Sequence, residues 1–126
     1  MFKNISKQEL DKIIDQHKLW VSSGGEKGEK ANLRYADLSS ANLSSANLSS
    51  ANLDFSAFPL WCGGLNVHID DKQATQLLYH LIRNVKYSKN TSAKLKRLCK
   101  LKSLVNQANE FHRVKECGKI EVTEDE

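Results

Sequence analysis

The chain of 126 residues contains one proline and few aromatic side chains, which make up 7% of the sequence, and it lacks any long hydrophobic run. No stretch approaches the roughly 20 apolar residues that a membrane-spanning helix needs. Residues 1–10 lack the apolar core of a secretory signal. A content of 40% hydrophobic and 27% charged residues is typical of a folded domain. We therefore expect a cytoplasmic protein that does not enter a membrane.

Acidic side chains are missing from a long segment of the second half. Between residues 72 and 109 there is no aspartate or glutamate, although the net charge of the whole chain is only +4. The same segment contains nine basic residues: Lys72, Arg83, Lys86, Lys89, Lys94, Lys96, Arg97, Lys100 and Lys102. The charge is therefore segregated along the chain, and the basic segment is a candidate for a binding surface.

A leucine recurs every five residues between 31 and 58, in units such as ANLSS and ADLSS, until Phe58 takes its place. A small residue precedes each of these side chains by two positions. On an α-helix five residues turn about 500°, so the leucines would spiral around the cylinder. On a flat strand an odd period would place them on alternate faces. The pattern therefore predicts a backbone that turns a corner at every fifth residue.

The run A(N/D)LXX resembles the pentapeptide-repeat family, and the resemblance implies a short right-handed quadrilateral β-helix over residues 31–58. Six units would make about one and a half coils, in which Leu33 stacks on Leu53 and Leu38 on Phe58, while Leu43 and Leu48 have no coil partner. The implied core ladder is Leu33, Leu38, Leu43, Leu48, Leu53 and Phe58. Such a short coil cannot cover its own ends, so the flanking segments are expected to cap it.

Helices are expected on both sides of the repeat, which gives a mixed fold class. Ser6 and Glu9 form a capping box that opens an N-terminal helix over 6–21. In the C-terminal region, 59–118, we expect one helix that ends near Val85 and another over 92–112. The inward residues predicted for the first of these are Ala74, Leu77, Leu78, Leu81 and Ile82. The whole of 1–118 is expected to be one domain, followed by a disordered acidic tail, 119–126.

No catalytic or nucleotide-binding motif is present in the sequence, so we expect a protein that is not an enzyme and that needs no cofactor. One set of residues has the chemistry of a structural zinc site, with two thiolates and two imidazoles. It consists of Cys62, His80, His112 and Cys117. The alternative is that the cysteines are small buried hydrophobic residues and that His80 lies at a helix boundary.

The basic segment allows three interpretations: a solvated helix face, a patch that binds an acidic protein, or a nucleic-acid site. Its candidate binding residues are Arg83, Lys86, Lys89, Lys94, Lys96, Arg97, Lys100 and Lys102. Clustered positive charge suits phosphate binding, but only Tyr79 and Tyr87 lie near enough in the sequence to stack on bases.

The layout of nearly the whole chain resembles small pentapeptide-repeat proteins encoded by phages and prophages. The residues that carry the resemblance are Lys18-Leu19-Trp20, Pro59 to Gly63, Leu78 to His80, and Phe111 to Gly118. It implies an accessory protein that acts inside a bacterial host cell and binds and inhibits or modulates a host factor, for example as an anti-defence or anti-CRISPR protein. The alternatives are direct binding of nucleic acid through residues 83–102, and a structural or assembly role in the phage particle. The sequence makes no prediction of the oligomeric state.

Some pentapeptide-repeat proteins inhibit DNA gyrase by resembling duplex DNA in length and negative charge. This chain differs from them in both respects, because its repeat is short and its outward Ser and Asn residues are neutral. The sequence therefore argues against DNA mimicry and favours another binding mode.

Overall fold

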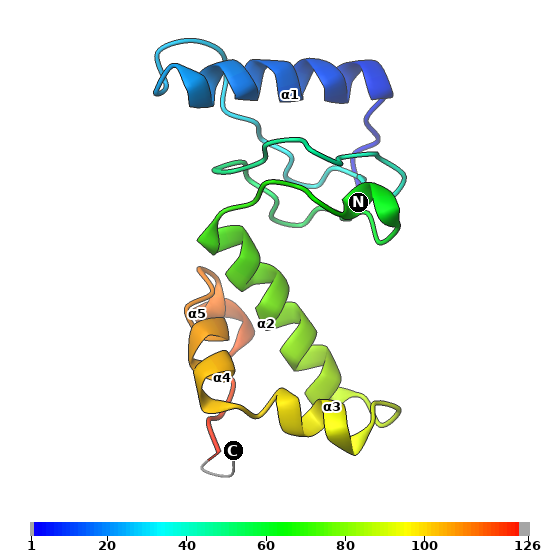
Figure 1. Ribbon diagram of the computed structural model, residues 1–126, viewed down its shortest axis with the longest axis vertical. Coiled ribbons are helices and arrows are strands. Elements are labelled where there is room, and N and C mark those ends of the chain that lie inside the picture. The colour runs from blue at the N-terminus through cyan, green and yellow to red at the C-terminus, as the bar shows by residue number, and fades with distance from the viewer. Residues whose placement is uncertain (1, 124–126) are drawn as a thin grey trace. The chain divides into compact units, whose positions relative to one another are not determined.

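A computed structural model describes residues 2–123, which divide into two compact units, one ending at Asp70 and the other beginning at Asp71 (Figure 1). The sequence predicted one domain over 1–118. The buried apolar side chains of the two units gather in separate clusters, one around the leucines of the repeat and one around Tyr79 and Ile82. No helix in the described part of the chain is long and apolar enough to cross a membrane.

The first unit begins with α1 (Lys7–Ser22), which closely matches the predicted helix. The hydroxyl of Ser6 accepts the N–H of Glu9 at 3.1 Å, as the capping box requires. After the helix the chain turns back along it. Gly28 has a φ of +73°, and a Cβ on it would lie 2.3 Å from the carbonyl oxygen of Gln16. Only glycine fits this close return, which leads directly into the repeat.

Within the repeat, residues 20 apart lie side by side. Parallel bridges join Asn32 to Asn52 and Asp37 to Ala57. The N–H of Leu38 donates to the carbonyl of Ala57 at 2.8 Å. The leucines point inward: Leu53 is 9% exposed and Phe58 is half-buried, and four side chains are at most 1% exposed, namely Leu33, Leu38, Leu43 and Leu48. The predicted core ladder therefore forms the centre of this unit.

The prediction of a quadrilateral β-helix is wrong. Residues 2–123 contain no β-strand and no sheet, and the contacts between successive turns of the repeat are isolated bridges. The physical reason is the five-residue period. A turn follows each bridge; for example, the N–H of Ala36 donates to the carbonyl of Leu33 at 3.0 Å. The turn interrupts the pairing before a ladder of hydrogen bonds can lengthen into a strand.

The stacking also continues beyond Phe58, which the sequence did not predict. The N–H of Leu43 donates to Gly63 at 2.7 Å, and that of Leu48 donates to His68 at 2.8 Å. These pairs span one residue more than the pair of Leu38 and Ala57, and the short η1 (Cys62–Gly64) lies in the lengthened segment. The prediction that Leu43 and Leu48 have no coil partner is therefore wrong.

The Asn or Asp that precedes each leucine has a structural role that sequence reasoning missed. Its side-chain Oδ1 accepts the backbone N–H two residues ahead. For example, the N–H of Ser44 donates to Oδ1 of Asn42 at 3.1 Å. The same bond recurs at Asn32, Asp37, Asn47 and Asn52. Because such Asx turns need only an oxygen acceptor, asparagine and aspartate serve equally well.

His17 joins α1 to the repeat and is fully buried, at 0% exposed. Its Nδ1 accepts the N–H of Ala31 at 2.9 Å, so the ring proton lies on Nε2. That nitrogen donates to the carbonyl of Ser49 at 2.7 Å. One side chain thus satisfies two backbone groups of the repeat.

The second unit is helical, with α2 (Asp71–Tyr87), α3 (Ala93–Leu98), α4 (Lys102–Ala108) and α5 (Val114–Cys117). Both α3 and α4 pack against α2. The predicted single helix over 92–112 is therefore interrupted. Leu101, with φ −55° and ψ 125°, is not helical. The break lets α3 and α4 meet α2 at two places, which one straight helix could not do.

The end of the described chain also differs from the prediction of a disordered tail from 119 onward. Ile120 is 3% exposed and belongs to the second cluster. Its N–H donates to Oδ1 of Asn109 at 2.8 Å, and its carbonyl accepts from Nδ2 of the same side chain at 2.9 Å. Residues 124–126 of the predicted tail lie outside the described residues.

Candidate functional site

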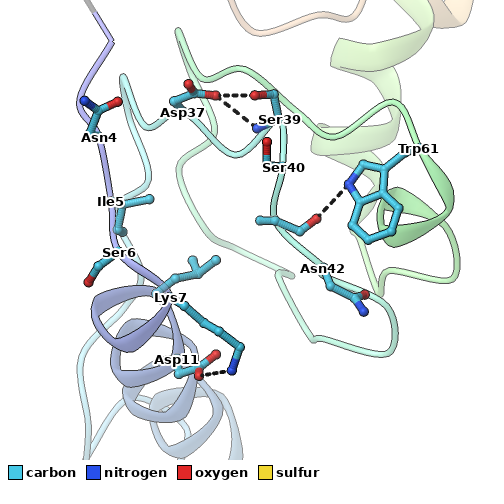
Figure 2. Close-up of a pocket in the computed structure, with 12 residues that line it drawn as sticks. Asn4, Ile5, Ser6, Lys7, Asp11, Asp37, Ser39, Ser40, Asn42 and Trp61 are labelled. Carbon is cyan, nitrogen blue, oxygen red and sulfur yellow. Dashed lines mark hydrogen bonds and ion pairs between the residues drawn. The ribbon is translucent and has the colours of Figure 1, made fainter.

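The first unit contains a pocket of about 510 Å³ between the start of α1 and the repeat. Figure 2 shows one side formed by residues 4–11 and the other by residues 37–42 with Trp61. Leu10, which is buried, and Ile5 and Ala41, which are half-buried, supply the apolar part of the lining. Sequence reasoning did not find this site, because its two sides are separated by 26 residues or more and meet only through packing of α1 on the repeat.

The charged groups of the pocket are Lys7, Asp11 and Asp37. Lys7 and Asp11 form an ion pair, with Nζ and Oδ2 3.2 Å apart (Figure 2). Asp37 Oδ1 accepts the hydroxyl of Ser39 at 2.6 Å and the N–H of Ser39 at 3.1 Å. The hydrogen bond from the Ser39 hydroxyl, and to a smaller extent the bond from the Ser39 N–H, hold the pKa of the Asp37 carboxyl below its usual value. The lining therefore carries one net negative charge at neutral pH.

Trp61 stands at the edge of the pocket and is 48% exposed. Its indole Nε1–H donates to the carbonyl of Ala41 at 3.2 Å, which orients the ring against the repeat (Figure 2). Its exposed ring beside polar groups is a candidate contact surface for a ligand.

Two of the eight residues predicted to form a basic binding patch have structural roles. Arg83 Nη1 donates to the hydroxyl of Tyr79 at 2.6 Å and to the carbonyl of Cys117 at 2.9 Å. The Tyr79 hydroxyl in turn donates to the carbonyl of Gly118. Arg83 therefore ties the segment after α5 to α2, which sequence spacing could not reveal because these groups are more than 30 residues apart.

Lys96 is the second of these residues. Its Nζ donates to the carbonyl of Val85 at 2.7 Å and to the carbonyl of Ser88. These oxygens lie at the end of α2, where the helix leaves carbonyls unpaired and its dipole favours a positive charge. Lys96 thus caps α2 from α3.

Replacing Lys96 with methionine should lower the free energy of unfolding by about 1–2 kcal/mol, because charge-assisted bonds to the end of α2 are lost. Lys94 is exposed in the same helix and serves as the matched control. Lys94→Met should change stability by less than about 0.5 kcal/mol. Urea unfolding of both variants measures the difference, and equal stabilities would contradict the capping role.

The other predicted basic residues lie at the surface of the second unit, and exposed leucines accompany them. The exposed basic residues are Lys86, Lys89, Lys94, Arg97, Lys100 and Lys102. Leu77 and Leu81 on α2 are 42% and 57% exposed, and Leu95 and Leu98 on α3 are each 47% exposed. The prediction that Ala74, Leu77 and Leu81 point into the core is therefore wrong, because all three are exposed. Tyr79, Ile82 and Val85 take the inward positions of α2.

The four residues of the predicted zinc site do not form a metal cluster. Cys62 belongs to the first unit, while His80, His112 and Cys117 belong to the second. Among residues 2–123, no group of three or more His, Cys, Asp or Glu side chains could hold a metal ion. The rings of His80 and His112 instead lie edge-on to Phe111, with centroids 5.8 and 5.0 Å apart.

The first unit is thus built on a five-residue repeat with inward leucines. The second unit is helical and has a surface of basic residues and exposed leucines. Residues 29–58 match the family model described as pentapeptide repeats, in eight copies. The match supports the resemblance of this segment to that family, and it covers the repeat without the flanking helices. Neither the curated proteins nor the solved structures contain a match.

Proposed function

We propose that this chain is a non-catalytic binding protein whose second unit docks an acidic, amphipathic segment of a partner protein. The observation that carries the proposal is the exposure of Leu77 and Leu81 on α2 and of Leu95 and Leu98 on α3. Each pair has helical spacing, so its two side chains lie on one face of their helix. Four half-exposed leucines in one unit are the kind of apolar surface that marks an interaction site.

The positive charge of this surface favours a negatively charged partner. No acidic residue lies between Lys72 and Asn109, and six basic side chains of the predicted patch are exposed there. Positive potential attracts an acidic partner and speeds its association. A second copy of the chain would bring two basic surfaces together, and their repulsion argues against a homodimer through this face.

Nucleic acid fits this surface less well than protein. Leucine side chains add nothing to phosphate binding, which depends on the number of available cations. Arg83 and Lys96 already bind carbonyl oxygens of the unit itself. In the setting that the phage resemblance implies, the partner would be a host factor, and the chain would inhibit or modulate it as an anti-defence protein.

The proposal is tested with two fluorescent probes, an amphipathic helical peptide of leucine and glutamate and a duplex DNA of random sequence. The double variant Leu77→Ser/Leu81→Ser should weaken binding of the peptide about tenfold or more, since burial of part of two leucines is lost. The control Leu60→Ser changes a leucine that is 99% exposed in the other unit and should leave binding unaltered.

Fluorescence anisotropy in moderate salt measures both probes. Tighter binding of the DNA than of the peptide, or equal peptide binding by the double variant and the wild type, would contradict the proposal. With bacterial lysate, capture of a protein that survives nuclease treatment and is lost in the double variant alone would support it.

A further inference from the structure

A second binding site, unrelated to the α2–α3 leucines, is suggested by the aspartate at position 37. Four of the five Asx turns of the repeat use asparagine, at positions 32, 42, 47 and 52, and each asparagine accepts the N–H two residues ahead. Only Asp37 carries a charge at this position. The turn therefore does not require the carboxylate, and that carboxylate lines the pocket of the first unit.

We propose that this pocket binds the basic side chain of an arginine or lysine in a peptide segment. Asp37 lines the pocket, and its hydrogen bonds to the N–H and the hydroxyl of Ser39 both use Oδ1. Trp61, which is 48% exposed, lines the same pocket. A carboxylate together with an aromatic face is the usual recognition chemistry for a cationic side chain.

The remaining lining suits the rest of such a side chain. Ile5 and Leu10 offer apolar contacts to its aliphatic stem, as long basic side chains commonly seek. The volume of about 510 Å³ lies within the range of small-molecule and peptide pockets. Lys7 is the one positive group of the lining, and its ion pair with Asp11 leaves the Asp37 charge available to the ligand.

The site is tested by NMR on the full-length chain with three blocked tripeptides, in which arginine, lysine or glutamine stands between two glycines. The arginine and lysine peptides should shift the indole N–H signal of Trp61 and the amide signals of Ser39 and Ser40. The glutamine peptide should shift none of them. The indole N–H signal of Trp61 is assigned as the one that disappears from the spectrum of the Trp61→Phe variant.

Asp37→Asn should weaken binding of the basic peptides at least tenfold and leave the fold intact, because asparagine makes the same turn in four neighbouring units. Asp15→Asn removes the same charge from an exposed position of α1 outside the pocket and should leave binding unchanged. Lys7→Gln should instead tighten binding a few-fold, an effect that a damaged fold could not produce.

Three results would overturn the site: no shift at millimolar basic peptide, equal binding of the glutamine peptide, or unchanged binding by Asp37→Asn. Relative binding of the arginine and lysine peptides identifies the preferred side chain. Leu77→Ser/Leu81→Ser should have no effect on this binding, so failure of this site and failure of the proposed function are distinguished.

Discussion

Replacing His17 with leucine should destabilise the first unit by about 2–6 kcal/mol. The N–H of Ala31 and the carbonyl of Ser49 would each lose their partner at the interface of α1 with the repeat, and a buried unpaired group costs about 1–3 kcal/mol. The leucine has a similar volume, so the loss would come from polar groups and not from a cavity. Chemical unfolding and hydrogen exchange at Ala31 measure the effect.

Two further substitutions separate the two hydrogen bonds of His17. Asn places an oxygen near the position of Nδ1, and Gln places an amide N–H near that of Nε2, so each should retain one bond and show an intermediate loss. His68 has an exposed side chain and provides the control. His68→Gln should leave stability nearly unchanged. If His17→Leu also proved harmless, the two bonds would not hold α1 on the repeat.

Leu43→Ala should destabilise the first unit as much as Leu33→Ala, by about 2–5 kcal/mol in each case. Both leucines are at most 1% exposed, and the chain beyond Phe58 supplies Leu43 with a neighbour through the bond to Gly63. A repeat that ended at Phe58 would instead leave Leu43 at an open end, where truncation costs little. Urea unfolding of the two variants distinguishes these cases, and a much smaller effect at Leu43 would contradict the observed stacking.

Local sequence rules predicted the features that depend on neighbouring residues. Ser6 accepts the N–H of Glu9 and caps the helix as expected, and α1 covers nearly the predicted range. The five-residue spacing located the buried leucines because one side chain in five can point inward when the backbone turns at that interval. It did not establish strands, since the pairing between turns is limited to single bridges.

Helical periodicity was less reliable in the second unit. When apolar residues occupy a wide part of the helix surface, their spacing does not tell which of them pack against the other helices. On α2 the inward residues are Tyr79, Ile82 and Val85, and the leucines at 77 and 81 remain exposed. The break at Leu101 likewise depends on where α3 and α4 meet α2. In both cases the decision rests on packing partners distant in the sequence.

The candidate sites differ in the same way. The sequence by itself determined the repeat, its inward leucines, the start of α1 and the segregation of basic charge, because each follows from residue type and spacing along a short stretch. Only the tertiary structure decided that Arg83 and Lys96 bind carbonyl groups of their own unit and that Asp37 shares a pocket with Trp61. These outcomes depend on contacts between segments that are distant in the sequence, and local spacing carries no information about such contacts.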